Sequence, residues 1–129
     1  RLAFAQKLAD SVYGREAPSK IVTVSYGEEI TLADHLFAGK TTIVDFYSEY
    51  CPPCVSVGPV LQKLVEGRED LAMVKVDINR PGRQGIDWES PAARQFNLRS
   101  IPHFQIYGPD GGLLAEGDQA VQMLMGWTQ

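Results

Sequence analysis

The sequence predicts a single α/β domain, with a central mixed β-sheet flanked by helices and an extra helix at the N-terminus. Short apolar segments typical of buried strands alternate with segments whose apolar residues recur at helical spacing. The chain has 129 residues, and 44% of them are hydrophobic, which suits one compact core. We expect residues 1–20 to form the N-terminal helix and a connector, and residues 21–129 to form the domain.

The charge of the chain argues against two classes of partner. With 12 basic and 16 acidic residues the net charge is −4, and no basic cluster offers a surface to nucleic acid or anionic lipid. No apolar run is long enough to span a bilayer. We therefore expect no nucleic-acid partner and no transmembrane segment. We also expect the protein to be a monomer.

The first expected elements are an amphipathic helix over residues 1–13 and a strand over residues 21–26. The helix has apolar residues at helical spacing, and the strand is β-branched and alternating. Thr31 or Asp34 is then expected to cap a short helical turn that Gly39 ends. These elements cover and extend the sheet before its central strand begins.

Thr41–Tyr47 is a near-continuous apolar run, as expected of a strand covered on both faces. Asp45 interrupts this run, and two interpretations of its carboxylate stay open. In the first, Asp45 faces a sheet edge or a polar partner and has no further role. In the second, it is buried, has a raised pKa and is ready to accept a proton.

The only two cysteines, Cys51 and Cys54, follow that strand and stand at the start of a predicted helix. Pro52 and Pro53 lie in the first turn, where a missing N–H costs nothing. A helix N-terminus stabilises a thiolate, so Cys51 is the expected nucleophile, with a lowered pKa. Cys54 lies one turn further on and is the expected resolving thiol, the more buried of the two. The helix ends near Gly67, and its apolar face consists of Val57, Val60, Leu61, Leu64 and Val65.

A second buried strand is expected over Leu71–Ile78, with Lys75 in its middle. Lys75 either extends to the surface, as strand lysines usually do, or neighbours Asp45 and tunes that carboxylate. The polar segment Asn79–Ser90 is expected to be a loop. Within it we expect Trp88 to fill the core, with an exposed binding aromatic as the alternative.

A helix, a hairpin and a last helix complete the expected order. Ser90 caps the first of these helices and Pro91 is its first residue. Strands over residues 103–107 and 113–116 form the hairpin. Asp118 is expected to cap the last helix. The apolar residues expected on the two helices are Ala92, Ala93, Phe96 and Leu98, then Val121, Leu124 and Met125.

Six short segments of the chain form an ordered set of landmarks. They are Val44-Asp45-Phe46-Tyr47, Cys51-Pro52-Pro53-Cys54, Pro59, Val74-Lys75-Val76-Asp77, Ile101-Pro102 and Gly117. In this order they resemble the thioredoxin superfamily, from about Ile21 to the C-terminus. A lone CxxC motif would be a weak signal, but six ordered landmarks are highly specific.

The resemblance implies a thioredoxin-like fold and thiol–disulfide exchange. It makes Cys51 the attacking thiolate, Cys54 the resolving thiol, and Asp45 a buried acid/base with Lys75 beside it. It also implies protein thiol or disulfide substrates and an upstream thiol reductant, with no cofactor. The expected function is a protein disulfide reductase, with a disulfide oxidase or isomerase as the alternative.

The same resemblance implies a groove for an extended substrate beside Pro102, whose peptide bond would be cis. His103 follows this proline, and two interpretations of it stay open: it stabilises the thiolate when protonated, or it merely packs beside the site. The residues expected to contact substrate are Ile101, Pro102, His103, Tyr50, Pro52 and Pro53.

The chain also departs from the common thioredoxin pattern. Pro52-Pro53 stands where Gly-Pro is usual, which bears on the redox potential, and Tyr47 and Tyr50 stand where tryptophans are usual. The lead-in over residues 29–34 is similar to that of the envelope-tethered TlpA/ResA type. With the missing initiator methionine, this similarity favours the bacterial periplasm or cell envelope, with the cytoplasm as the alternative.

Two non-enzymatic functions also have to be weighed. A structural zinc site would need more ligands than the two cysteines, and His35 and His103 lie on unrelated segments without ligand spacing, so we expect no metal. A thioredoxin-fold module could instead bind peptides at Pro102 with its cysteines idle. An enzyme would reduce insulin disulfides with dithiothreitol and lose this activity in C51S/C54S, whereas such a module would retain partner binding in that double mutant.

Overall fold

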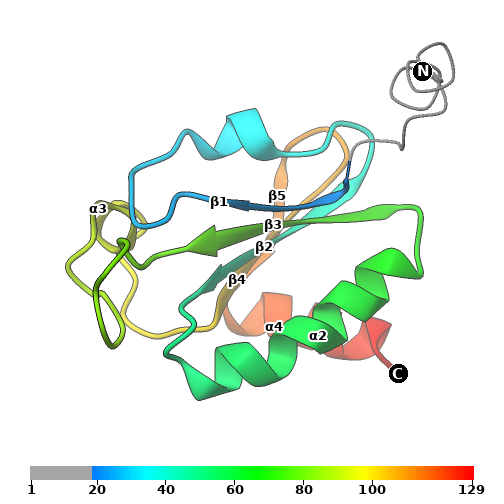
Figure 1. Ribbon diagram of the computed structural model, residues 1–129. Helices are drawn as coiled ribbons and strands as arrows, with labels where there is room; N and C mark the ends of the chain where they lie inside the picture. Colours follow the sequence, from blue (N-terminus) through cyan, green and yellow to red (C-terminus); the bar gives the residue numbers. More distant parts are fainter. Residues whose placement is uncertain (1–18) are drawn as a thin grey trace, which may run out of the picture.

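The computed structural model of the protein describes residues 19–129, so the helix expected over residues 1–13 lies outside the described residues. The described residues form a five-stranded sheet flanked by helices, which confirms the predicted fold class (Figure 1). The elements in chain order are β1 (Ile21–Val24), η2 (Leu32–His35), β2 (Thr41–Tyr47), α2 (Pro52–Glu66), β3 (Leu71–Asp77), α3 (Pro91–Gln95), β4 (His103–Tyr107), β5 (Leu113–Glu116) and α4 (Asp118–Trp127).

The sheet is mixed, with the strand order β1-β3-β2-β4-β5. Strands β1, β3 and β2 run parallel, whereas β4 pairs antiparallel with β2, and β5 pairs antiparallel with β4. Strand β2 is therefore the centre of the sheet, with neighbours on both edges and helices on both faces. This position explains its almost unbroken apolar sequence.

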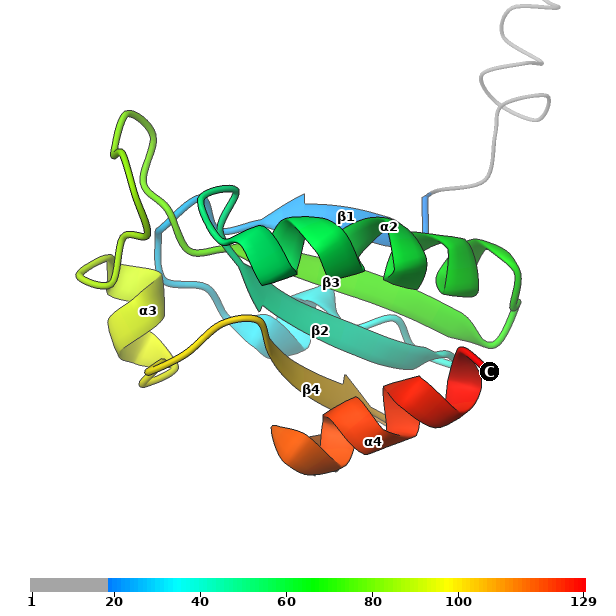
Figure 2. The ribbon, with the colours of Figure 1, turned by 90° about the horizontal axis from the view of Figure 1, so that it is seen from below.

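Two apolar clusters lie on the two faces of the sheet. Helices α2 and α4 lie side by side on one face (Figure 2), where Leu61, Val65 and Leu124 pack against Ile43 of β2. On the other face, the segment around η2 and the end of α3 pack against Val44 and Phe46. Because successive strand residues point to opposite faces, β2 contributes alternately to the two clusters. It thereby fixes α2 against one face of the sheet.

Two elements are shorter than the sequence indicated. Strand β1 ends at Val24 because Ser25 and Tyr26 have positive φ values of 84° and 50°, which no strand tolerates. Helix α3 ends at Gln95 rather than continuing through Leu98, and Asn97 has a φ of 52°. In both cases a residue in the left-handed region ends the element, and β-branching or apolar spacing does not signal such a residue.

The predicted apolar faces of α2 and α4 are partly wrong. Val60 is 50% exposed, and Val121 and Met125 are 37% and 60% exposed. Leu61 and Leu124, on the same helices, are buried as predicted. Spacing identifies an apolar stripe on a helix, but only the width of the contact with the sheet decides which members of the stripe are covered.

The predicted helix caps have mixed outcomes. Ser90 is confirmed as the cap of α3, because its Oγ accepts a hydrogen bond from the Ala93 N–H at 3.0 Å. Thr31 is the residue before η2 but makes no side-chain capping bond. Asp118 is wrong as a cap, because it is the first residue of α4 and Gly117, with a φ of 64°, precedes it.

The loop over residues 79–90 is held by its own polar contacts. Arg80 donates from Nε to Asp87 Oδ2 at 2.9 Å, and the Asp87 N–H donates to Asn79 Oδ1 at 3.1 Å. The hydrogen bond from the Arg80 side chain lowers the pKa of Asp87 to about 2. Trp88 is 41% exposed, so the expectation that it fills the core is wrong. Asp87, not an aromatic ring, organises this loop.

Candidate active site

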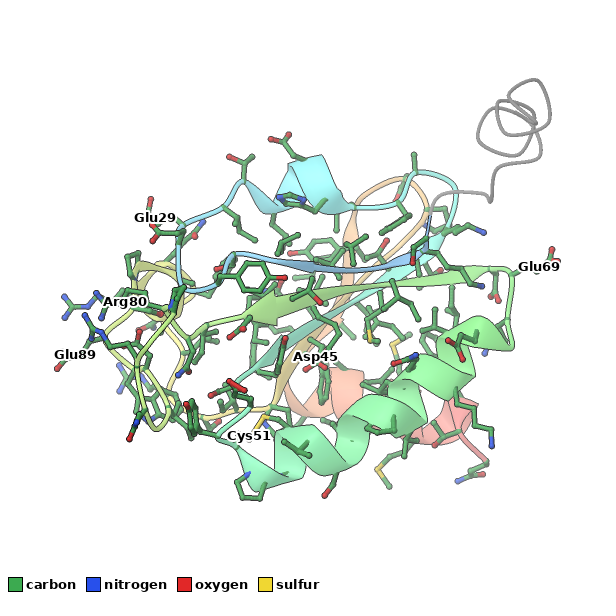
Figure 3. All side chains as sticks on the ribbon, in the orientation of Figure 1. Glu29, Asp45, Cys51, Glu69, Arg80 and Glu89 are labelled. Atoms are coloured by element: carbon green, nitrogen blue, oxygen red, sulfur yellow. A yellow bond between two sulfur atoms is a disulfide. The ribbon has the colours of Figure 1, made fainter. Side chains whose placement is uncertain are left out.

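Cys51 and Cys54 form a disulfide at the N-terminus of α2, with their Cα atoms 5.2 Å apart. Cys51 lies at the start of α2 (Figure 3) and is its N-cap residue. The Cys54 N–H donates to Cys51 Sγ at 3.2 Å. The first sulfur therefore sits where free helix N–H groups and the positive end of the helix dipole are directed. The two cysteines are 2% and 3% exposed, so the expectation that Cys54 is clearly the more buried is wrong.

A tight turn after β2 positions the cysteine pair. The Cys51 N–H donates to the Ser48 carbonyl oxygen at 3.1 Å, and the Tyr50 N–H donates to Ser48 Oγ at 3.1 Å. Pro52 and Pro53 then occupy the first turn of α2, as predicted, and both are exposed. Tyr50 is 43% exposed beside them. The turn thus presents a rigid, mainly apolar surface around the buried disulfide.

Asp45 is a buried carboxyl group on β2, only 1% exposed. It points to the α2 face of the sheet, because it lies two residues after Ile43, which packs against α2. In Figure 3, Asp45 lies between the sheet and α2, the helix whose N-cap is Cys51. Its Oδ1 atom has no hydrogen-bond partner among the residues that the structure describes. Burial raises the pKa of Asp45 to about 7, against the opposing effect of Lys75. Asp45 can therefore gain or lose a proton near neutral pH.

Lys75 neighbours Asp45 in the sheet. This is the second of the two positions that the sequence left open for it, the first being extension to the surface. The residues are register partners across the parallel strands β2 and β3. The positive charge of Lys75 works against burial and lowers the pKa of Asp45. A cation beside a buried carboxyl group favours its ionised form.

Ile101 and Pro102 directly precede β4, and the peptide bond between them is cis, as the resemblance implied. Cys51 Sγ is 3.7 Å from the Ile101 carbonyl oxygen. This backbone segment, which leads into β4, therefore forms one wall beside the sulfur that a substrate has to reach.

His103 lies in the same segment, but its side chain faces away from α2. It is the register partner of Phe46, and the two rings have centroids 5.7 Å apart on the face opposite Asp45. Its Nε2 is 2.9 Å from Glu116 Oε2. The structure therefore gives this imidazole a carboxylate partner on the α3 face rather than a sulfur.

Sequence reasoning missed the polar group around His103. Gln105 Nε2 donates to Glu116 Oε2 at 2.9 Å, and the hydrogen bonds from Gln105 and His103 lower the pKa of Glu116. With residues 96–100, His103 and Glu116 line a polar hollow of about 390 Å³. The pairing of β4 with β5 brings these side chains together, and no local sequence signal marks it.

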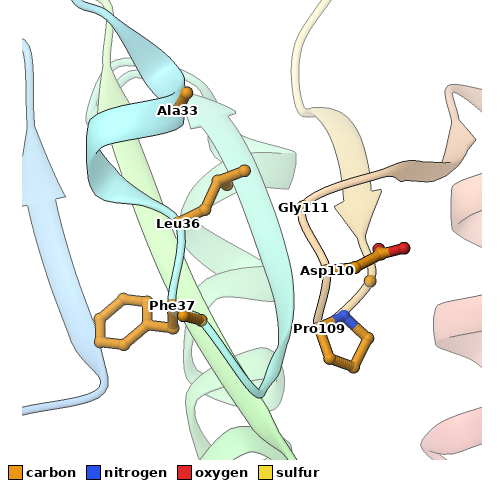
Figure 4. Close-up of a pocket in the computed structure, with 8 residues that line it drawn as sticks. Ala33, Leu36, Phe37, Pro109, Asp110 and Gly111 are labelled. Carbon is orange, nitrogen blue, oxygen red and sulfur yellow. The ribbon is translucent and has the colours of Figure 1, made fainter.

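A second hollow, of about 380 Å³, lies at the other end of the sheet. Ala33, Leu36 and Phe37 line one side, and Pro109 to Gly111 of the β4–β5 turn line the other (Figure 4). Strand β2 begins at this end, at Thr41, whereas the disulfide follows its opposite end at Tyr47. This hollow is therefore not part of the site around Cys51.

Two further observations concern residues 19–129 only. Among them, no group of three or more His, Cys, Asp or Glu side chains is arranged to hold a metal ion. None of the helices formed by these residues combines the length and apolar character needed to cross a bilayer.

Comparison of the chain with known proteins shows the family to which it is similar. The family model described as Thioredoxin matches residues 22–123. The thioredoxin of Mycolicibacterium smegmatis is 32% identical over 81 residues, which cover 62% of this chain and 67% of that protein. The bifunctional thioredoxin reductase/thioredoxin of Mycobacterium leprae is 30% identical over 112 residues, or 86% of this chain.

A solved structure agrees on the fold. The structure of Trichomonas vaginalis thioredoxin matches with a TM-score of 0.60 and 22% identity, covering 85% of this chain and 96% of that one. The chain spans only 21% of the M. leprae protein, and 59% of the thioredoxin of Mycoplasmoides gallisepticum.

Proposed function

The chain belongs to the thioredoxin family, and on this premise we propose that it is a thiol–disulfide oxidoreductase that works as a protein disulfide reductase. One observation carries the proposal. The Cys51–Cys54 disulfide caps α2, and the buried Asp45, with its pKa raised to about 7, lies on the face that α2 covers. This arrangement supplies a nucleophile, a resolving thiol and a proton acceptor.

The first step is attack by the Cys51 thiolate on one sulfur of a substrate disulfide. A bond forms between Cys51 Sγ and that sulfur, the substrate S–S bond breaks, and the second substrate sulfur leaves as a thiolate that takes a proton from water. The N-cap position of Cys51 stabilises the attacking thiolate.

The second step closes the enzyme disulfide. Asp45 accepts the proton of the Cys54 thiol, and the Cys54 sulfur then attacks Cys51 Sγ. The mixed disulfide breaks, and the first substrate sulfur leaves as a thiolate. Over both steps the substrate gains two electrons and the enzyme dithiol loses them. An upstream thiol reductant returns the enzyme to the dithiol form.

The wall at Ile101 and Pro102 is the proposed place for substrate. The Ile101 carbonyl oxygen is 3.7 Å from Cys51 Sγ, so a chain laid along this segment would bring its own sulfur to Cys51. Tyr50, Pro52 and Pro53 are exposed on the other side and would contact the substrate with apolar surface.

Reduction of insulin disulfides with dithiothreitol tests the proposal. We expect turnover by the wild-type protein and none by C51S/C54S. C54A should accumulate mixed disulfides and C51A should not, because only Cys51 is placed to attack. Equal trapping by both variants would contradict the assigned roles, and partner binding retained by C51S/C54S without any wild-type turnover would favour the non-catalytic module.

The reduction potential of the Cys51–Cys54 pair decides the direction of transfer. Equilibration against a glutathione series should give a value near that of thioredoxin, about −270 mV, for a reductase. A value closer to about −120 mV would make the protein an oxidant of substrate thiols instead.

We also propose a bacterial envelope location, supported by the lead-in of residues 29–34 and its similarity to the TlpA/ResA type. Fractionation of cells that express the whole protein tests this location. Recovery in the cytoplasmic fraction alone would contradict it.

A further inference from the structure

Four polar side chains of β2 and β3 gather on the α2 face of the sheet. Asp45 and Tyr47 are two residues apart on β2 and so point to the same face. Lys75 of β3 is the register partner of Asp45, and Asp77 is the register partner of Tyr47. The parallel pairing therefore places one cation among two carboxyl groups and a phenol.

The Lys75 ammonium lies over the Tyr47 ring, with Nζ 4.6 Å from the ring centroid. This distance is within the range of a cation–π contact, which favours a cation over the face of an aromatic ring. A strand lysine otherwise extends its ammonium to water. The contact with the ring therefore keeps the ammonium over β2, on the same face of the sheet as Asp45.

Among residues 19–129, Lys75 is the one cation that acts on the pKa of Asp45. Across β2, its antiparallel partner on β4 is the apolar Phe104. At the start of α2, the N-cap residue Cys51 and Cys54 in the first turn are joined in the disulfide and carry no charge. Lys75 is the charged group that acts on Asp45 against its burial, whereas Asp77 and Asp45 both act on Tyr47.

We propose that the Tyr47 ring holds the Lys75 ammonium beside Asp45, and that Tyr47 is thereby a positioning residue that sets the pH at which Asp45 releases its proton. The inference rests on the proposed function in one respect, that Asp45 accepts the Cys54 proton. Tyr47 acts through Lys75 and not through either sulfur.

Tyr47 itself stays neutral while it does this. Burial, followed by the charges of Asp77 and Asp45, raises the pKa of Tyr47 to about 12. The phenol therefore carries no charge at any pH at which Asp45 titrates. Replacing the ring by an aliphatic side chain would free the ammonium to move towards water, where distance and screening weaken its effect on Asp45.

A four-variant titration tests the inference. The Asp45 carboxyl carbon is followed by NMR against pH in the oxidised protein, where no cysteine titrates, for wild type, Y47F, Y47L, K75M and Y47L/K75M. Y47F keeps the ring and should titrate like wild type. Y47L should bind the Asp45 proton about threefold more tightly, so that Asp45 titrates at higher pH. K75M should also titrate at higher pH.

The double variant gives the decisive comparison. Since Tyr47 acts only through Lys75, Y47L/K75M should titrate like K75M. A Y47L titration equal to wild type, or the same Y47L effect with and without Lys75, would overturn the inference. If Y47L does not fold, Y47M offers a flexible apolar side chain for the same comparison. Because this titration needs no disulfide exchange, an absence of insulin reduction would count against the proposed function alone.

Discussion

Asp45 shows how one residue links stability to chemistry. Its pKa of about 7 in the folded protein lies above the value of 3.8 for a free side chain. The folded state therefore holds a proton that the unfolded chain has released between about pH 4 and about pH 7. Over that window the stability contributed by the protonated carboxyl is lost as the pH rises. The same carboxyl that serves as proton acceptor thus destabilises the fold at neutral pH.

We expect D45N to remove this dependence. In the oxidised wild-type protein, Asp45 should lower the free energy of unfolding by about 4 kcal/mol between about pH 4 and about pH 8. Because the amide that replaces the carboxyl group in D45N stays neutral, the free energy of unfolding of this variant should decrease much less over the same pH range. D45N should therefore be the more stable protein at pH 8. Urea unfolding at both pH values measures this difference, and parallel pH dependences for the two proteins would contradict it. D45N should also slow insulin reduction.

At the scale of elements, the start of α2 and the loop over residues 79–90 are held in different ways. In the turn before α2, a backbone hydrogen bond from the Cys51 N–H to the Ser48 carbonyl oxygen positions Cys51 as the N-cap. The loop has few apolar residues to bury and is held instead by Asp87, whose side chain is 4% exposed and bonded by Arg80. Hydrogen bonds to one buried carboxylate, rather than apolar packing, therefore hold that loop.

We expect D87N to loosen the loop. The amide loses the charge-assisted hydrogen bonds from Arg80, which should lower the free energy of unfolding by about 2 kcal/mol at pH 7. E89Q changes an exposed carboxylate on the same loop and is the matched control. Because the pKa of Asp87 is lowered to about 2, its stabilising contribution should be lost as the pH falls from about 4 towards 2. Equal stabilities of D87N and E89Q in urea unfolding would contradict this role.

At the scale of the whole molecule, β2 joins two cores that face opposite sides of the sheet. Leu61 belongs to the core beneath α2 and is 1% exposed, whereas Val60, the preceding residue, is 50% exposed. The contact of α2 with the sheet therefore depends on one side of the helix. That contact also fixes the disulfide at the start of α2 relative to Asp45.

We expect L61A and V60A to differ strongly in their free energy of unfolding, although the two positions are adjacent. L61A opens a cavity in the core and should lower the free energy of unfolding by about 3 kcal/mol. V60A removes exposed surface and should lower it by well under about 1 kcal/mol. Thermal or urea unfolding of the oxidised proteins measures both. Similar losses would show that Val60 is covered in solution.

The fold and the reacting pair could be predicted from the sequence because their signals are local. Apolar runs, Pro52 and Pro53 in a first turn, and the spacing of Cys51 and Cys54 each act over a few residues. The remaining site residues depend on pairing between strands, which the sequence does not state. The sequence leaves two interpretations open for Asp45 and two for Lys75, and the β2–β3 register decides between those of Lys75 by making the two residues neighbours.

Only the tertiary structure decided which side chains are buried and to which face of the sheet each one points. Trp88 and Val60 are exposed, and His103 turns to Glu116 on the face away from α2. Each depends on which surfaces meet when the sheet is covered, and a residue type alone cannot fix that. The sequence by itself determined that two cysteines stand at a helix start after a buried strand. The tertiary structure decided which charges surround the carboxyl beside them, because those charges come from segments far apart in the chain.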